Sequence, residues 1–132
     1  MIRTIAVCCG FALMLGGCAG NETVAAYGAG DRVWQVVEIN GVSFASTATL
    51  QFAEQGQIRG TGPCNSYTAR MVAPYPWFDV AQITQTRKTC PDLADETRFL
   101  EALRDMTLSE VLADTMILSN DAGDSIILKS DG

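Results

Sequence analysis

The 132-residue chain contains no histidine. Without an imidazole, it cannot form a Ser-His-Asp triad, a Cys-His couple or a histidine-ligated zinc site. It also lacks the side chain that most often carries acid-base chemistry near neutral pH. No other pairing of a nucleophile with a base is visible in the sequence. We therefore expect a protein that is not an enzyme and that uses no metal and no cofactor.

Positive charge is also scarce. Nine Lys and Arg residues stand against fifteen Asp and Glu residues, and the net charge is -6. An acidic surface repels phosphate backbones, and the sequence has no basic cluster that would offset this repulsion. The charge balance therefore argues against nucleic acid as a partner.

The one apolar run near the N-terminus is too short to cross a bilayer. It extends from Ile5 to Leu15, which is 11 residues, whereas a membrane-spanning helix needs about twenty. Arg3 precedes the run and small residues follow it, a pattern typical of a secretory signal. A buried core helix is the alternative interpretation.

Residues 15–18, with the sequence LGGC, resemble the lipobox of bacterial lipoproteins. This resemblance implies a signal peptide over residues 1–17 and a lipid on Cys18, the first residue of the mature protein. Several acyl chains on one residue would anchor the protein stably, because each buried methylene contributes about 0.8 kcal/mol. Ala19 is not the Asp associated with inner-membrane retention. We therefore expect a cell-envelope protein, attached in a Gram-negative host to the outer membrane and facing the periplasm.

The cysteine count agrees with this localisation. Of five cysteines, Cys8 and Cys9 lie in the predicted signal peptide, and Cys18 would carry the lipid. Cys64 and Cys90 remain, and in an oxidising compartment they most simply form one disulfide, which would contribute about 3 to 4 kcal/mol. A pair of free or redox-active thiols is the alternative, although the C-x-x-C spacing is absent.

The mature chain divides into a spacer and one domain. Small and polar residues follow Cys18, so residues 18–31 are expected to be a flexible tether, with residues 32–130 as the folded domain. Apolar alternation and turn residues predict strands within that domain. These strands lie at residues 32–39, 49–52, 58–71 with an interruption after Gly60 and Gly62, 77–84, 108–113, 115–119 and 125–129.

One helix interrupts the strands. Pro91 lies near its first turn, and Asp92 and Glu96 face the positive end of the helix dipole, which explains this acidic pair without catalysis. Apolar residues at three- and four-residue spacing give the helix one buried face. These residues are Leu93, Phe99, Leu100, Leu103 and Met106.

The order of several short motifs is the most distinctive feature of the chain. The motifs are Trp34 with Asn40-Gly41, Cys64-Asn65, Thr86-Arg87 with Cys90, and Glu96 with Phe99 to Leu103. Over about residues 32–129 this order resembles the META domain of HslJ-like envelope lipoproteins. The family pattern has an early W and N-G, then G-C-N, T-R-x-x-C and a helix of the form E-x-x-F-L-x-A-L. Pro63 and Ala69 depart from it, because the family usually has Gly at both positions.

The resemblance implies both a fold and a role. The fold is α+β and mainly β, a strongly curved antiparallel sheet or partial barrel packed around one α-helix. The role is that of a lipid-anchored envelope protein with a non-catalytic binding or structural function, in tolerance of envelope stress. The alternative is a lipocalin-like carrier of a small ligand or a protease inhibitor in the periplasm. The partners are the membrane, through Cys18, and an unidentified protein or small molecule.

Four residues are candidates for partner binding. Tyr75 and Trp77 belong to the segment PYPWF at residues 74–78, where aromatic side chains on a rigid loop could anchor a partner. Arg87 and Lys88 form a cationic pair that could receive an anionic ligand. Each pair also has a simpler explanation, which is core packing for the aromatic residues and an exposed strand end for the cations.

Two further segments are explained without a ligand. The side chain of Asn65 can satisfy neighbouring backbone groups in a tight segment. Residues 121–124, with the sequence DAGD, lack the spacing of a calcium loop and predict a hairpin turn.

Trp77 and Phe78 must point to opposite faces if they lie on a strand, so at least one of them should be buried.

Overall fold

A computed structural model describes residues 23–54 and 56–131. These residues form nine strands, one α-helix and one short 3-10 helix. The helices are η1 (Val24–Tyr27) and α1 (Leu93–Asp105). The strands are β1 (Val33–Ile39), β2 (Val42–Ser43), β3 (Thr49–Phe52), β4 (Gln57–Thr61), β5 (Ser66–Met71), β6 (Val80–Gln85), β7 (Leu108–Leu112), β8 (Thr115–Ser119) and β9 (Ser125–Ser130).

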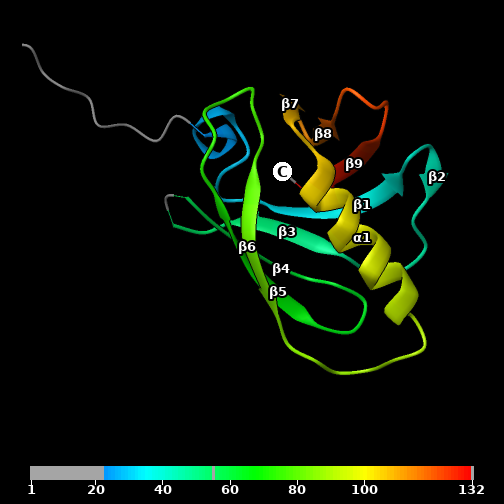
Figure 1. The fold of residues 1–132 in the computed structure, drawn as a ribbon. Coiled ribbons are helices and arrows are strands. Elements are labelled where there is room, and N and C mark those ends of the chain that lie inside the picture. The colour runs from blue at the N-terminus through cyan, green and yellow to red at the C-terminus, as the bar shows by residue number, and fades with distance from the viewer. Residues whose placement is uncertain (1–22, 55, 132) are drawn as a thin grey trace, which may run out of the picture.

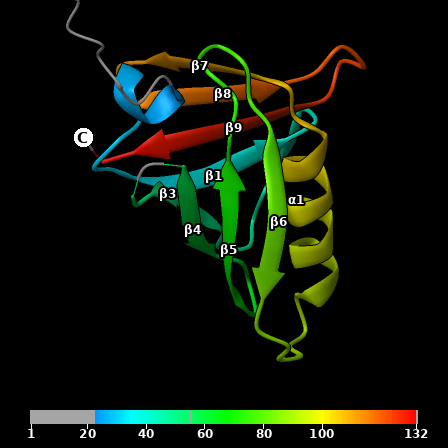
Figure 2. The ribbon, with the colours of Figure 1, turned by 60° about the vertical axis from the view of Figure 1, so that its left-hand side comes forward.

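The strands form one antiparallel sheet in the order β6-β5-β4-β3-β1-β9-β8-β7, and β2 pairs with β1 outside this path. Trp34 on the central strand β1 lies opposite Leu50 of β3 on one side and Ser130 of β9 on the other. The sheet is strongly curled, and α1 lies beside the edge strand β6 (Figures 1 and 2). This architecture confirms the predicted curved sheet with one helix.

The two halves of the curled sheet meet at one end. Phe78, just before β6, donates its backbone N–H to the carbonyl oxygen of Thr107 at 2.8 Å. The backbone N–H of Ser109 in β7 donates to the carbonyl oxygen of Pro76 at 2.7 Å. These contacts link the segment that leads into one edge strand with the start of the other, so the sheet is a partial barrel.

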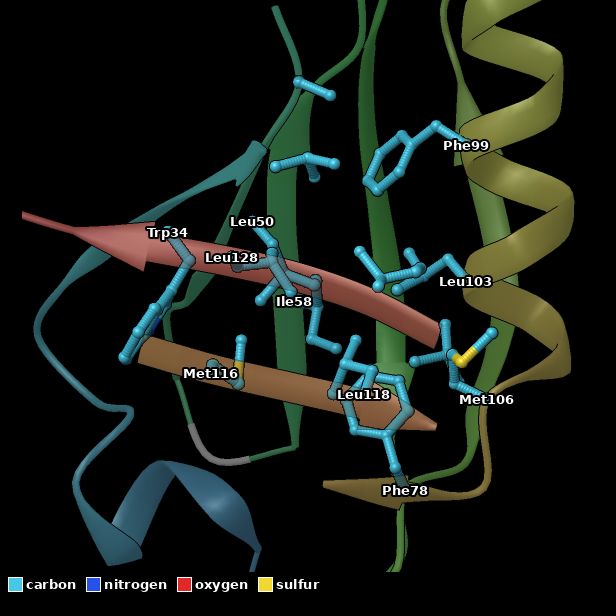
Figure 3. Close-up of a cluster of buried hydrophobic side chains, with 14 of the residues drawn as sticks. Trp34, Leu50, Ile58, Phe78, Phe99, Leu103, Met106, Met116, Leu118 and Leu128 are labelled. Carbon is cyan, nitrogen blue, oxygen red and sulfur yellow. The ribbon is translucent and has the colours of Figure 1, made fainter. Parts of the chain in front are cut away.

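Side chains fill the interior of the barrel. Alternate residues of β5 are buried, as its alternation predicts, and they are Tyr67, Ala69 and Met71. Figure 3 shows side chains from the sheet, such as Trp34 and Ile58, on the same interior side as Phe99 and Leu103 of α1. All four are fully buried. The helix therefore completes the core of the sheet.

The packed structure begins earlier than expected. Val24 and Ala29, inside the segment interpreted as a spacer, have no exposed surface. The indole N–H of Trp34 donates to the carbonyl oxygen of Ala29 at 2.9 Å. Composition predicts a flexible tether here because few side chains are bulky, but two small apolar residues are enough to dock η1 on the core.

Three other predictions need correction. The strand expected from residue 77 begins at Val80, and Trp77 makes only an isolated bridge with Leu108. The region expected as an interrupted strand over residues 58–71 is a hairpin of two strands, β4 and β5. Leu93, placed on the buried face of the helix, is 37% exposed because it lies at the open first turn.

No helix within residues 23–54 and 56–131 is long and apolar enough to cross a membrane.

Candidate functional site

A groove of about 670 Å³ lies between the C-terminal half of β6 and α1. β6 leads into a loop over residues 86–92, and α1 then runs back along β6, so this connection closes one end of the groove (Figure 2). The lining residues come from the strand, the loop and the helix. They include Ile83, Gln85, Arg87, Lys88, Leu93, Thr97 and Arg104.

A buried carboxylate holds the groove together. Glu96 on the first turns of α1 is only 2% exposed. One carboxylate oxygen, Oε1, accepts the backbone N–H groups of Asn65 at 2.6 Å and of Cys64 at 3.2 Å. The other, Oε2, accepts from Nδ2 of Asn65 at 2.7 Å. Glu96 therefore connects the helix to the β4–β5 loop.

Asn65 continues this connection to the loop after β6. Its Oδ1 accepts from the backbone N–H of Lys88 at 2.6 Å and from the hydroxyl of Thr86 at 2.9 Å. Its Nδ2 also donates to the carbonyl oxygen of Lys88 at 3.0 Å. The side chain does satisfy backbone groups, but those groups are distant in sequence. The network fixes three segments around the closed end of the groove.

Gly62 permits the close approach of Glu96. A Cβ atom at residue 62 would lie 2.5 Å from Oε1 and 2.9 Å from Cγ of Glu96, which is closer than side chains approach one another. The backbone N–H of Gly62 also donates to the carbonyl oxygen of Asn65 at 2.7 Å and tightens the same loop. Glycine is therefore required here by the space that the carboxylate occupies.

A disulfide joins the same segments covalently. Cys64 and Cys90 are bonded, with their Cα atoms 5.7 Å apart. Cys64 lies in the β4–β5 loop beside Asn65, and Cys90 lies two residues before Asp92, the residue that directly precedes α1. The bond therefore fixes the position at which the chain enters the helix, as the sequence suggested.

Three exposed cations surround the groove without an ionic partner. They are Arg87 and Lys88 on the loop and Arg104 near the end of α1. In the part of the chain that the structure describes, the only ion pair joins Arg98 to Asp95 at 3.5 Å. The carboxylate of Glu96 is occupied by N–H donors. The groove is thus a local concentration of positive charge on an acidic protein, suited to an anionic group.

The four candidate binding residues separate into two pairs. Arg87 and Lys88 lie at the groove, whereas Tyr75 and Trp77 precede the other end of β6. Tyr75 stacks on Tyr27 of η1 with ring centroids 4.7 Å apart, and the Tyr75–Pro76 peptide bond is cis. Trp77 is 58% exposed and Phe78 is buried, so the two neighbours do face opposite ways. The aromatic pair therefore does not contribute to the groove.

Sequence reasoning missed two residues of the site. Glu96 was explained by the helix dipole alone, yet it lies on the buried stripe, three and seven residues before Phe99 and Leu103. A charged residue at a core position of this stripe indicates a buried hydrogen-bonded network. Arg104 belongs to no motif that indicates binding. It lines the groove only because α1 folds back along β6, and no local sequence pattern indicates this long-range packing.

Tyr67 belongs to the buried core and does not line the groove. Burial raises the pKa of the Tyr67 phenol, whose hydroxyl donates to the carbonyl oxygen of Thr49 at 2.7 Å, so this group keeps its proton. Within the described residues, no cluster of three His, Cys, Asp or Glu side chains could hold a metal ion. Residues 121–124 lie in the turn between β8 and β9, where Nδ2 of Asn120 donates to Asp124 at 3.1 Å.

Comparisons with known proteins agree with the fold. The profile of a family described as META domain matches residues 28–131. An NMR structure of a protein from Burkholderia xenovorans superposes with a TM-score of 0.66 at 20% identity, over 82% of this chain and 87% of the other. A crystal structure of a DUF4847 family protein from Bacteroides vulgatus ATCC 8482 superposes with a TM-score of 0.62 at 13% identity, over 83% of this chain and 96% of the other. At these identities the likeness concerns the fold alone. No curated protein matches the sequence.

Proposed function

The chain belongs to the META domain family over residues 28–131, and from this membership we propose that it is a lipid-anchored envelope protein with a non-catalytic binding role. In this proposal Cys18 carries the lipid and the groove between β6 and α1 receives the partner. The setting is the periplasmic face of the outer membrane in a Gram-negative host, under envelope stress.

The groove is the observation that carries the binding role. Three cations without an ionic partner surround it, and both of its walls are held by the network of Glu96 and Asn65 and by a disulfide. A site that is rigid before binding loses less conformational entropy when a ligand arrives. The combination of unpaired charge and fixed walls supports recognition of an anionic partner.

The anchor is supported by the sequence, and Cys18 lies outside the described residues. Thr23, where the described part begins, is five residues further along the chain. Five residues extend at most about 18 Å. Because η1 packs on the core directly after Thr23, the domain would stay close to the membrane and would meet partners in that layer.

The alternative of an internal ligand carrier lacks support in the fold. A carrier needs an apolar cavity of some hundreds of cubic ångströms. The side chains that fill the barrel include Trp34, Phe99 and Met116, all fully buried. The groove is on the surface and is bordered by charge. We therefore propose that the partner binds outside the barrel. No feature of the described residues favours protease inhibition.

The anchor is tested by the intact mass of the protein recovered from cell membranes. We expect a mass that lacks residues 1–17, carries acyl chains, and rises by two hydrogens on reduction. A Cys18→Ala variant should carry no acyl mass. An unprocessed wild-type chain without acyl groups would overturn the anchored function.

The binding role is tested by cross-linking in cells. A photoreactive amino acid replaces Thr97, which is exposed and lines the groove, or Asp121, which is exposed in the β8–β9 turn. We expect a discrete adduct from position 97 alone, weakened when Arg87 and Lys88 are both changed to Glu. Equal adducts from both positions, or none from either, would argue against the groove as the binding site.

A further inference from the structure

The wall of the groove formed by β6 is a strand edge that α1 borders, and no described strand pairs with its outer side. β6 ends the strand order and pairs only with β5 among the described strands. The backbone N–H of Thr86 donates to the carbonyl oxygen of Ser66 at 3.1 Å, and Thr84 lies opposite Thr68. Because backbone groups alternate in direction along a strand, the N–H and C=O groups of Gln85 and the C=O group of Ile83 point away from β5.

A bulge limits this edge to a short stretch. The register between β5 and β6 shifts between Thr68 and Arg70, and Gln82 has a φ of 54°. Bulges twist an edge strand and interrupt its pairing, which protects proteins from uncontrolled edge-to-edge association. The backbone available for pairing is therefore residues 83–85, and this stretch lines the groove.

The surroundings of this edge combine apolar and cationic groups. Ile83 on the strand and Leu93 on the helix are partly exposed apolar side chains in the groove. Arg87, Lys88 and Arg104 supply positive charge around them. A strand laid along β6 would meet an apolar surface on one face and cations beside it. A ligand that matches both features alternates apolar and acidic residues.

We infer that the groove binds an extended acidic peptide segment of a partner protein, which adds to the sheet as a strand beside β6. This inference rests on the proposed function of the groove as a binding site. Main-chain hydrogen bonds to Ile83 and Gln85 would supply affinity, and the cations would select acidic side chains. A second copy of the chain fits less well, because pairing β6 with β6 would bring two cationic grooves together.

The test uses a fluorescent hexapeptide that alternates glutamate and valine, with the protein as recovered from membranes. Fluorescence anisotropy measures its dissociation constant. The matched control alternates lysine and valine. We expect the acidic peptide to bind at concentrations up to about 1 mM and the basic peptide to bind at least about tenfold more weakly. Equal binding of the two peptides, or no binding of the acidic one, would overturn the inference.

Strand addition is distinguished from simple charge attraction by two ester analogues of the acidic peptide. In one the N–H of each valine is replaced by an ester oxygen, and in the other the N–H of each glutamate is replaced. Because N–H groups alternate along a strand, only one of the two sets can donate to β6. We expect one analogue to lose binding and the other to keep it. Identical affinities of both analogues would mean that the cations attract any anion without strand pairing.

Charge-reversal variants test whether the peptide binds at the groove. Arg87→Glu with Lys88→Glu should weaken the acidic peptide by at least about tenfold. Arg59→Glu with Arg70→Glu is the matched control, because both side chains are exposed on β4 and β5 and the net charge changes equally. The control should change the affinity less than about twofold, and an equal loss in both variants would contradict the inference. If the wild-type chain proves to carry no lipid and still binds the peptide, the anchor is refuted and the peptide site stands.

Discussion

Glu96 occupies a position where the period of the helix calls for an apolar side chain, and its carboxylate receives three N–H groups. In a Glu96→Gln variant, the amide in place of Oε2 would face Nδ2 of Asn65, so two donors would oppose one another. We expect the free energy of unfolding, measured by denaturant titration, to fall by about 2 kcal/mol, the usual size of a lost hydrogen bond to a charged group.

Glu101→Gln on the same helix is the control for this prediction. Glu101 is exposed and its replacement should change stability by less than about 0.5 kcal/mol. A double-mutant cycle of Asn65→Ala and Glu96→Ala should show a coupling energy of about 1 to 3 kcal/mol. Additive losses would mean that the two side chains act separately and that the groove is held by the disulfide alone.

Trp77 and Phe78 are neighbours in sequence with opposite surroundings. Phe78 is 2% exposed, so Phe78→Ala should lower the free energy of unfolding by about 3 to 5 kcal/mol. Trp77 is largely exposed, and Trp77→Ala should cost less than about 1 kcal/mol. Thermal or denaturant unfolding of both variants checks this contrast. Similar losses would show that Trp77 also belongs to the core.

At the level of single residues, the sequence indicated the contrast between Trp77 and Phe78 because adjacent strand-like residues face opposite ways. It did not indicate which of the two is buried. That choice depends on the backbone hydrogen bond from Phe78 to Thr107, which joins segments 29 positions apart. The buried role of Glu96 likewise depends on a loop that is about thirty positions away.

The disulfide acts on whole elements, because it joins the β4–β5 loop to the start of α1. Loop entropy for a separation of 26 residues gives a stabilisation of about 3.5 kcal/mol. Cys64→Ser and Cys90→Ser should each lower the melting temperature by a similar amount, and the double variant should be no less stable than either. Differential scanning fluorimetry with and without a reductant checks this prediction.

Reduction of the wild-type protein supplies the control, since reduced wild type and the double variant should unfold at nearly the same temperature. Additive losses in the two single variants would contradict a shared bond. A loss confined to one variant would assign the effect to the local packing of that cysteine.

The β7–β8 turn contains a residue in an unfavourable backbone conformation. Ala113 has a φ of 54°, in the left-handed region that glycine adopts without steric cost. Ala113→Gly should therefore raise the free energy of unfolding by about 0.5 to 1 kcal/mol. Ala122→Gly, in the β8–β9 turn, should lower it slightly because Ala122 is not among the residues of positive φ. Denaturant titration of both variants measures the difference, and equal signs would refute this explanation.

The strands and the helix were the features of this protein that the sequence predicted best. Alternation along β5 matches its burial pattern, and β8 and β9 also bury every second residue, because one face of a curved sheet is buried and the other is more exposed. The helix lies where its apolar stripe and acidic first turn predict it, since both are local features. The beginning of β6 was less predictable, because Trp77 and Phe78 pair with Leu108 and Thr107, which are distant in sequence, and not with β5.

At the scale of the whole molecule, the domain includes the residues just before Arg32. A chain that begins at Arg32 should be less stable than one that begins at Thr23 by about 3 kcal/mol. The loss combines the burial of Val24 with the hydrogen bond from Trp34 to Ala29. Denaturant titration of both chains and of the longer mature chain measures it. Equal stability of the two shorter chains would show that docking of η1 does not stabilise the core.

Periodicity and turn residues, which are properties of neighbouring residues, predicted strands and a single helix. The order of the motifs indicated the META family, and that resemblance implied the curved antiparallel sheet. The cysteine count also indicated one disulfide. The groove could not be predicted in this way. Its cations, its buried carboxylate and its strand edge come from segments that meet only when α1 folds back along β6. Long-range packing brings these groups together, and no pattern within a single segment of the chain records which distant segments will meet.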